Sequence, residues 1–213
     1  MHILITIEMI NQANYTLHNL MVTKWSTQDL FSIKWWGEIG FVIISYIFCF
    51  SLLDKTRLTK TILFGSLISV FSVVIEIVGC NSNLWAYSLP IYPMIPNIFL
   101  LDITVIPLYY MLIYQRAYSW KSYAVWNIGA SAFLGFVFSP LVVSLGLVQL
   151  IQWNYVNTFL IIAFVGFLAK AVISLIISFE EQYQTKQQVW QTSVLFQPAV
   201  KPLDEESDKK NKN

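Results

Sequence analysis

Residues 59–79 read TKTILFGSLISVFSVVIEIVG, and this stretch decides the class of fold. A helix of about 20 apolar residues crosses the hydrocarbon core of a membrane, and the stretch has that length with Glu76 as its single acid. The whole 213-residue chain shares this character, since 56% of its residues are hydrophobic and the mean hydropathy is +0.60. Only 12% are charged, about half of the roughly 25% typical of soluble domains. Much of the chain therefore requires lipid as its solvent.

Five segments in all have the length and composition of transmembrane helices. They cover residues 35–53, 59–79, 98–114, 123–147 and 155–179. The third is short and the fourth is long, so tilt or breaks are expected there. Pro107 and Pro140 should kink these two helices, because proline removes a backbone hydrogen bond. The predicted fold is all-α, a polytopic membrane protein with a bundle of about five transmembrane helices.

The spans divide the chain into three parts. Residues 1–34 are too polar to cross a membrane and are predicted to form an extramembrane segment with an interfacial helix. Residues 35–179 form the transmembrane domain. Residues 180–213 form a polar cytoplasmic tail, whose end, 201–213, is predicted to be disordered because it is polar and mixed in charge.

The short loops predict the orientation of the chain. Two of them are basic and contain Lys55, Arg57, Lys60, Arg116 and Lys121, whereas the other two contain no Lys or Arg. By the positive-inside rule the basic loops are cytoplasmic, which places the N-terminus outside and the C-terminus in the cytoplasm. Lys24 and Lys34 lie on the opposite side and weaken this bias slightly.

A proline-rich stretch, LPIYPMIPNIFLLD, occupies residues 89–102. Pro90, Pro93 and Pro96 fall in a predicted external loop, and proline at every third residue favours the polyproline II conformation. A cytoplasmic proline-rich ligand motif would lie on the other side of the membrane. We therefore expect a rigid lid or a re-entrant connector at the outer interface.

Small and polar residues recur every three or four positions in three of the predicted spans. These stripes are Gly65, Ser69 and Ser72 in the second span, Asn127, Ser131, Gly135 and Ser139 in the fourth, and Gly166 and Ser174 in the fifth. Lipid offers polar side chains no hydrogen-bond partner, and small residues let helix backbones approach closely. The three stripes are therefore predicted to face one another, with the bulky faces toward lipid.

Four ionisable residues are not explained by helix packing alone: Glu38, Glu76, Asp102 and Lys170. The three acids lie at a similar predicted depth and could form a cation or proton site. Alternatively, each acid caps a helix or bonds a Trp or Tyr in the loop above it, and Asp102 lies where the dipole of its own helix would stabilise a carboxylate. Lys170 is too far from the acids for direct contact, and its side chain is expected to reach the interface.

The sequence lacks the residue patterns that several kinds of catalytic and metal sites require. His2 and His18 both fall in the N-terminal segment, and no nucleophile elbow, P-loop, HExxH or acidic cluster is present. We therefore expect no metal, no cofactor and no enzymatic activity. With a net charge of +1, no basic surface suggests nucleic acid. The expected partners are the lipid bilayer and a second copy or another membrane protein.

Residues 84–175 resemble a family of small multi-pass membrane proteins of bacilli and clostridia. The resemblance rests on LWAYSLPIYPMIPNIFLLDITVIPLYYMLIYQ, SWKSY and SPLVVSLGLVQLIQW. The matching positions are Trp85, Pro93, Pro96, Asp102, Pro107, Tyr114, Gln115, Trp120, Lys121, Pro140, Gly146 and Trp153. Where the family commonly has Glu and Trp, this chain has Ser139 and Ser144. If the family uses that Glu chemically, this chain has lost the activity or has replaced the Glu with Glu76. The resemblance implies a bacterial plasma membrane and no established activity.

Three functions fit these observations. The first is a non-enzymatic structural or accessory component of the bacterial cell membrane. The second is a small cation- or proton-coupled transporter that uses the intramembrane carboxylates. The third, a lipid-modifying membrane enzyme, has the least support, because only carboxylates and hydroxyls are at hand for catalysis.

Overall fold

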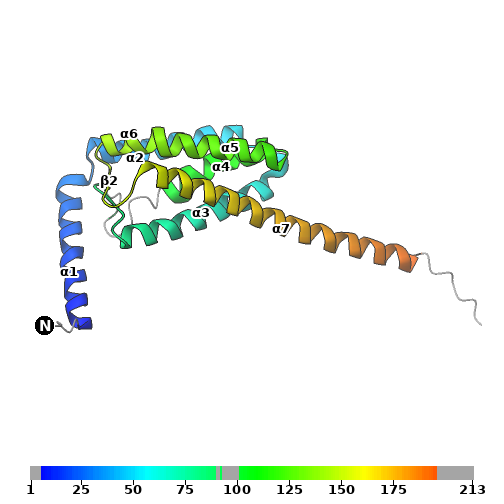
Figure 1. Ribbon diagram of the computed structural model, residues 1–213, viewed down its shortest axis with the longest axis horizontal. Coiled ribbons are helices and arrows are strands. Elements are labelled where there is room, and N and C mark those ends of the chain that lie inside the picture. The colour runs from blue at the N-terminus through cyan, green and yellow to red at the C-terminus, as the bar shows by residue number, and fades with distance from the viewer. Residues whose placement is uncertain (1–5, 90–91, 93–100, 196–213) are drawn as a thin grey trace, which may run out of the picture. The chain divides into compact units, whose positions relative to one another are not determined.

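The computed structural model describes residues 6–89, 92 and 101–195 of the chain, and most of them are helical (Figure 1). The helices are α1 (Ile7–Lys24), α2 (Ile33–Leu52), α3 (Leu58–Asn81), α4 (Ile106–Arg116), α5 (Trp120–Phe133), α6 (Ser139–Ser144) and α7 (Tyr155–Leu195). The chain forms two compact units. Met1–Ile173 holds the bundle, and Ser174–Asn213 holds the later part of α7.

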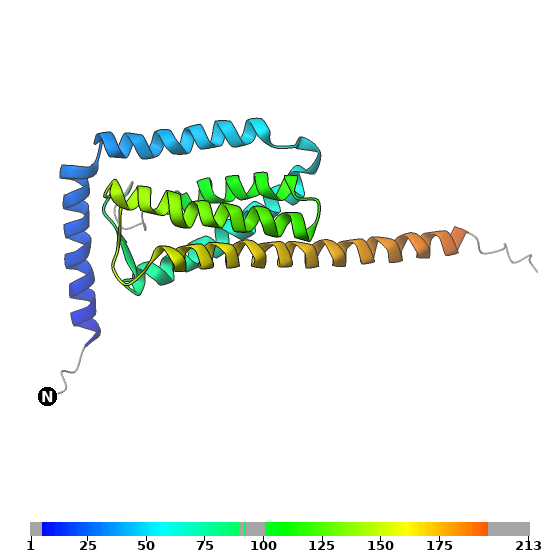
Figure 2. The same ribbon diagram turned by 45° about the horizontal axis from the view of Figure 1, so that its top comes forward.

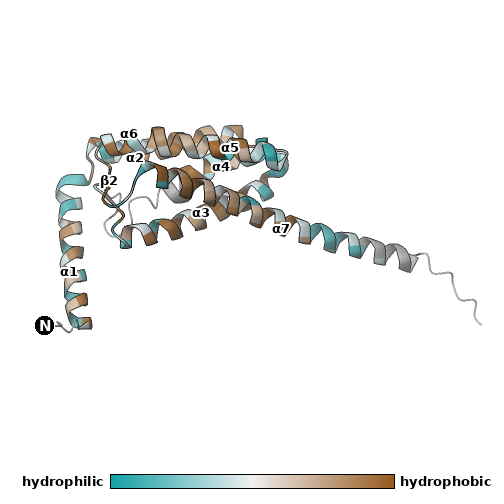
Figure 3. Ribbon diagram, viewed as in Figure 1, coloured by the Kyte–Doolittle hydropathy of each residue, from teal (hydrophilic) through white to brown (hydrophobic). Residues whose placement is uncertain are grey.

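Four helical stretches are long and apolar enough to cross a membrane: Ile33–Leu52, Lys55–Asn81, Trp120–Ser144 and Tyr155–Gln187. They match the first, second, fourth and fifth predicted spans, so the predicted all-α polytopic membrane fold is confirmed. Large apolar side chains face outward over these helices, such as Ile44 (67% exposed) and Ile47 (68% exposed) on α2. The hydropathy colouring of Figure 3 shows that apolar residues predominate along the helices of the bundle. A surface of this kind is expected to face lipid.

The third predicted span is only partly described. Its described part comprises a π-helical turn, η3 (Leu101–Val105), followed by α4, and is shorter than the roughly 20 residues of a full span. Residues 98–100 lie outside the described residues, as do Pro90, Pro93 and Pro96 of the proline-rich loop. The predicted lid or re-entrant connector therefore stays a prediction.

The breaks expected in the third and fourth spans take the form of π turns. The turn η3 lies just before Pro107, and η4 (Leu134–Phe138) lies just before Pro140. A proline ring clashes with the carbonyl four residues earlier, here those of Ile103 and Phe136. Both of these residues lie inside the wider turns, which relieve the clash while the helix continues.

Within Met1–Ile173, α4 lies at the centre of the packing. The helix α3 packs along α4, and α2 packs against α4 and η3. Cys49 and Leu53 join Leu108, Met111 and Leu112 in one apolar cluster. Figures 1 and 2 show α1 running across the direction of α2, and no residue of α1 is buried.

The two loops without Lys or Arg pair as a small antiparallel sheet, which was not predicted. Strand β1 (Trp85–Tyr87) aligns with β2 (Val148–Leu150), with Trp85 opposite Leu150. The pairing extends on both sides, because the Ser88 N–H donates to the Leu147 carbonyl at 2.9 Å and the Ile151 N–H donates to the Leu84 carbonyl at 2.9 Å. This end of the bundle is called the hairpin end below. The opposite end, with the loops at 53–57 and 117–119, is called the basic end.

The polar stripes of the fourth and fifth spans face each other. The Asn127 Nδ2 donates to the Ala163 carbonyl at 3.0 Å, and the Tyr123 hydroxyl donates to the Gly166 carbonyl at 2.7 Å. A Cβ on Gly135 would lie 2.9 Å from the Cβ of Phe159. These contacts join α5 and η4 to the part of α7 before residue 174.

The stripe of the second span, in contrast, meets α4, a helix in which no stripe was predicted. A Cβ on Gly65 would lie 2.6 Å from the sulfur of Met111. Ser131 of the fourth span also reaches α4, through its hydroxyl at 3.1 Å from that of Tyr110. Ser174 belongs to the second unit.

The second unit continues α7 past the predicted end of the transmembrane domain. The helix runs to Leu195, because the residues after 179 include the good helix formers Glu, Gln and Lys. The Gln184 side chain donates to Glu180 one turn earlier, at 3.4 Å. Residues 201–213, the predicted disordered end, lie outside the described residues.

The close contact at Gly166 predicts a measurable loss of stability. A Cβ at this position would lie 2.0 Å from the Asn127 Oδ1 and 2.9 Å from the Tyr110 ring. Gly166→Ala is expected to destabilise the protein by about 1–3 kcal/mol through overpacking. Gly129→Ala is the matched control, since nothing lies within 4 Å of its Cβ position. Thermal unfolding in detergent would show equal melting temperatures for the two variants if the packing at Gly166 did not matter.

Candidate functional site

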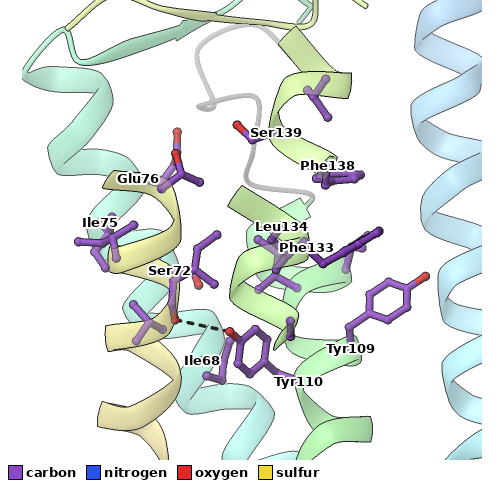
Figure 4. A pocket seen from close by; sticks show the side chains of 18 of the residues that line it. Ile68, Ser72, Ile75, Glu76, Tyr109, Tyr110, Phe133, Leu134, Phe138 and Ser139 are labelled. Atoms are coloured by element: carbon purple, nitrogen blue, oxygen red, sulfur yellow. Dashed lines mark hydrogen bonds between the residues drawn. The ribbon is translucent and has the colours of Figure 1, made fainter. Parts of the chain in front are cut away.

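Unit Met1–Ile173 contains a chamber of about 810 Å³ bounded by α2 to α6 and the start of α7. Figure 4 shows its walls, with Ile68 and Ile75 on one helix and Phe133, Leu134 and Phe138 on another. Most of the lining is apolar, and its two charged residues are Glu76 and Arg116. Gly65 packs beside Met111, and counting helical rise outward from this contact separates the levels of Glu76 and Arg116 by roughly 25 Å. The chamber therefore extends between the hairpin end and the basic end.

The carboxylate of Glu76 holds the hairpin onto α3. Glu76 is 7% exposed, and its Oε1 accepts a hydrogen bond from the Trp85 indole N–H at 2.7 Å and one from the Cys80 thiol at 3.0 Å. The Trp85 ring lies against Gly79, where a Cβ would come within 2.0 Å of it. Trp153 meets the Trp85 ring edge-on, with centroids 5.0 Å apart. Glu76 thus bonds a Trp of the loop above it, as expected if the acid has a structural role and does not bind a cation.

Hydroxyl groups line the same end of the chamber. Figure 4 shows Glu76 and Ser139 at this end, on different helices. Thr158 also lines the chamber, and its hydroxyl accepts from the Trp153 indole N–H at 3.0 Å. The hairpin end is therefore mildly polar, whereas the middle of the chamber is lined by aliphatic and aromatic side chains.

At the basic end, Gln115 joins the ends of α2 and α4. Its Nε2 donates to the Leu52 carbonyl at 2.8 Å, and its Oε1 accepts from the Asp54 N–H at 2.9 Å. The Asp54 carboxylate accepts from both the N–H and the hydroxyl of Thr56, and these bonds lower the pKa of Asp54 below its ordinary value. Asp54 therefore stays ionised near neutral pH.

The two basic loops lie together at this end. Arg57 stacks over the ring of Tyr118, with its Cζ 5.5 Å from the centroid, so the loops after α2 and α4 touch. Arg116 is exposed and lines the chamber mouth. Gln115 is the last residue of the stretch that resembles the family, LWAYSLPIYPMIPNIFLLDITVIPLYYMLIYQ. Arg116 follows it and is the first residue of the basic segment.

Lys170 lies in an aromatic cage outside the chamber lining. Its Nζ is 4.6 Å from the Tyr114 ring centroid, 5.4 Å from Tyr123 and 5.9 Å from Trp120. Aromatic faces stabilise a cation through their quadrupoles. The lysine therefore ties α7 to α4 and α5, a contact that sequence spacing within a single helix could not reveal.

The predicted acid group is only partly described. Glu38 is half-buried on α2 and is not a lining residue of the chamber, and the side chain of Asp102 lies outside the described residues. In the described ranges, no three His, Cys, Asp or Glu side chains are placed to hold a metal ion. The cation or proton site formed by Glu38, Glu76 and Asp102 stays a prediction.

Sequence reasoning did not assign roles to Lys24 and Lys34, the two lysines that oppose the charge bias. Lys24 pairs with the buried Asp29 at 2.9 Å and donates to the Ser88 carbonyl. Lys34 donates to the Leu145 carbonyl at 2.9 Å, after the end of α6. Both lysines fasten the N-terminal part of the chain to the hairpin end, which gives them a structural reason to lie there.

The bond between Glu76 and Trp85 predicts a graded response to substitution. Glu76→Gln keeps an oxygen acceptor and should retain most of the stability. Glu76→Leu leaves the buried indole N–H without an acceptor and should destabilise by about 1–3 kcal/mol. Thermal unfolding in detergent measures both, and Trp85→Phe is the control background. If Glu76→Leu lowered the melting temperature equally in the wild-type and Trp85→Phe backgrounds, the hydrogen bond between Glu76 and Trp85 would not contribute to stability.

The aromatic cage predicts that the charge of Lys170 stabilises the fold. Lys170→Met keeps an unbranched apolar stem but loses the cation, and should destabilise by about 0.5–2 kcal/mol. Lys170→Arg retains a cation that stacks on aromatic rings and should lose less. Lys121→Met, at an exposed lysine in the first turn of α5, should have no effect. A melting temperature as low for Lys170→Arg as for Lys170→Met would argue against the cation's role.

The chain matches no protein-family model, no curated protein and no solved structure. The resemblance of residues 84–175 to membrane proteins of bacilli and clostridia therefore stays a prediction.

Proposed function

We propose that this chain is a non-enzymatic accessory component of a bacterial cell membrane, which holds a lipid chain in the chamber between its helices. The observation that carries the proposal is the chamber itself. Its volume of about 810 Å³ lies within the roughly 300–1,000 Å³ of small-molecule sites. A largely apolar chamber surrounded by spans is filled most favourably by apolar chains, and lipid is the apolar molecule at hand.

The hydrogen bonds of Glu76 support a lipid-holding role for the chamber over a catalytic one. Its carboxylate already accepts bonds from Trp85 and Cys80, so it acts as a fixed acceptor for the hairpin. A general acid or base would need hydrogen-bond access to a substrate proton. The non-enzymatic assignment rests on this occupied carboxylate.

The orientation within the membrane is part of the same proposal. Both basic loops meet at one end, as the contact of Arg57 with Tyr118 indicates, and the positive-inside rule places that end in the cytoplasm. The N-terminus is then outside, and α1, which runs across α2 (Figure 2) and buries none of its residues, lies at the outer interface. A second copy or another membrane protein could contact its exposed side chains.

A cation- or proton-coupled permeation role is the second candidate. It is favoured by one observation, the buried Glu76 at the wall of a chamber that also contains Ser139. Cation flux in proteoliposomes that disappears in Glu76→Gln would favour this role over the holding role.

Filling the chamber should abolish lipid retention. Ala130 lines the chamber, so Ala130→Phe places a ring inside it. Val125→Phe adds a ring at an exposed position of the same helix that does not line the chamber. Native mass spectrometry after detergent exchange should find lipid retained by the wild type and Val125→Phe, and largely lost from Ala130→Phe. Equal retention by all three would refute the proposal.

A further inference from the structure

The two charged residues of the chamber differ in their surroundings. Glu76 is buried and accepts two hydrogen bonds. Arg116 is exposed at the basic end and makes no hydrogen bond or ion pair within the part of the chain that the structure describes. An arginine stays protonated in proteins, and its planar guanidinium matches the oxygens of a phosphate in a bidentate manner. The chamber mouth thus presents an available anion-binding group.

The chamber opens sideways between α2 and α5. Toward the hairpin end this side is closed, because Phe41 of α2 stacks on Phe138 of η4 with centroids 6.2 Å apart. Phe48 of α2 and Trp126 of α5, nearer the basic end, line the chamber and are about half exposed, at 50% and 51%, as is Phe133 further along, at 57%. The opening therefore includes the half of the bundle that contains Arg116.

We infer that the chamber binds one acidic phospholipid, with its phosphate on Arg116 and an acyl chain that enters between α2 and α5 and runs toward Glu76. This inference rests on the proposed function and adds the chemical class of the ligand. The distance of roughly 25 Å between the levels of the two charged residues exceeds half of the roughly 30 Å hydrocarbon core, which is the depth that the acyl chains of one leaflet fill. The chamber thus accommodates the full length of a chain.

The charge distribution selects the direction of the lipid and the sign of its head group. Besides Arg116, the basic end carries Lys55 in the loop after α2 and Lys60 in the first turn of α3, and basic residues beside membrane helices attract acidic lipids. The far end carries the Glu76 carboxylate, which repels a phosphate. A zwitterionic head group gains less at Arg116, because its own cation offsets the phosphate charge.

The test compares phosphatidylglycerol with phosphatidylcholine of identical acyl chains, each added to the full-length protein in neutral detergent. Native mass spectrometry should show about tenfold tighter binding of phosphatidylglycerol by the wild type, as one charge-assisted contact supplies. Arg116→Gln should bind both lipids equally, and Arg116→Lys should keep part of the preference. Lys121→Gln removes a neighbouring charge outside the chamber lining and should keep all of it. Melting temperatures establish that each variant is folded.

Two results would overturn the inference. One is equal binding of the two lipids by the wild type while Ala130→Phe still loses lipid, which would leave the lipid-holding function intact. The other is full displacement of phosphatidylglycerol by inorganic phosphate, which would make Arg116 a site for free anions. Retention of lipid by Ala130→Phe would instead remove the lipid-holding function.

Discussion

Lipid gives polar groups no hydrogen-bond partner, and this constraint governs how the helices of this protein meet. The side chains of Tyr110, Tyr123 and Asn127 are buried within the bundle, and each reaches a neighbouring helix through a hydrogen bond. Two of these bonds end on backbone carbonyls of α7. Close approach is available there because Gly166 has no side chain: the Asn127 Oδ1 stands 2.0 Å from where a Cβ would be. That oxygen is buried and accepts no hydrogen bond within the part of the chain that the structure describes.

The same constraint explains why the chamber can stay open elsewhere. Polar contacts and small residues join α5 to α7, whereas α2 packs mainly on α4 and η3 and offers apolar side chains to the remaining space. Within a membrane, an apolar gap between helices has no hydrophobic reason to close, because lipid chains fill it as well as leucine does. The π turns before Pro107 and Pro140 let the helical backbone continue past each proline in the two segments that line this gap.

Much of the fold was available from the sequence. Hydropathy predicted four spans that match the long apolar helices, although the last helix continues past residue 179, because a membrane imposes a length and a composition that are both local properties. Helical spacing likewise indicated the polar faces of Asn127 and Gly166, which the structure brings together. The pairing of β1 with β2 had no such signal. Each strand has three residues, and each finds its partner far along the chain. The aromatic cage of Lys170 draws its rings from two other helices, so no pattern within one span could predict it.

The Glu76 carboxylate has two roles: it fastens the hairpin to α3, and it lines one end of the chamber. A buried carboxylate is costly unless it is bonded, and the indole of Trp85 supplies the bond by bringing β1 over the end of α3. Once made, this bond places a negative or hydrogen-bonding group at one end of an apolar chamber and leaves the cation of Arg116 at the other. The polarity of the chamber is therefore a consequence of how the hairpin is fastened. A lipid with a single anionic head can lie along it in only one favourable direction, with the head toward the basic end.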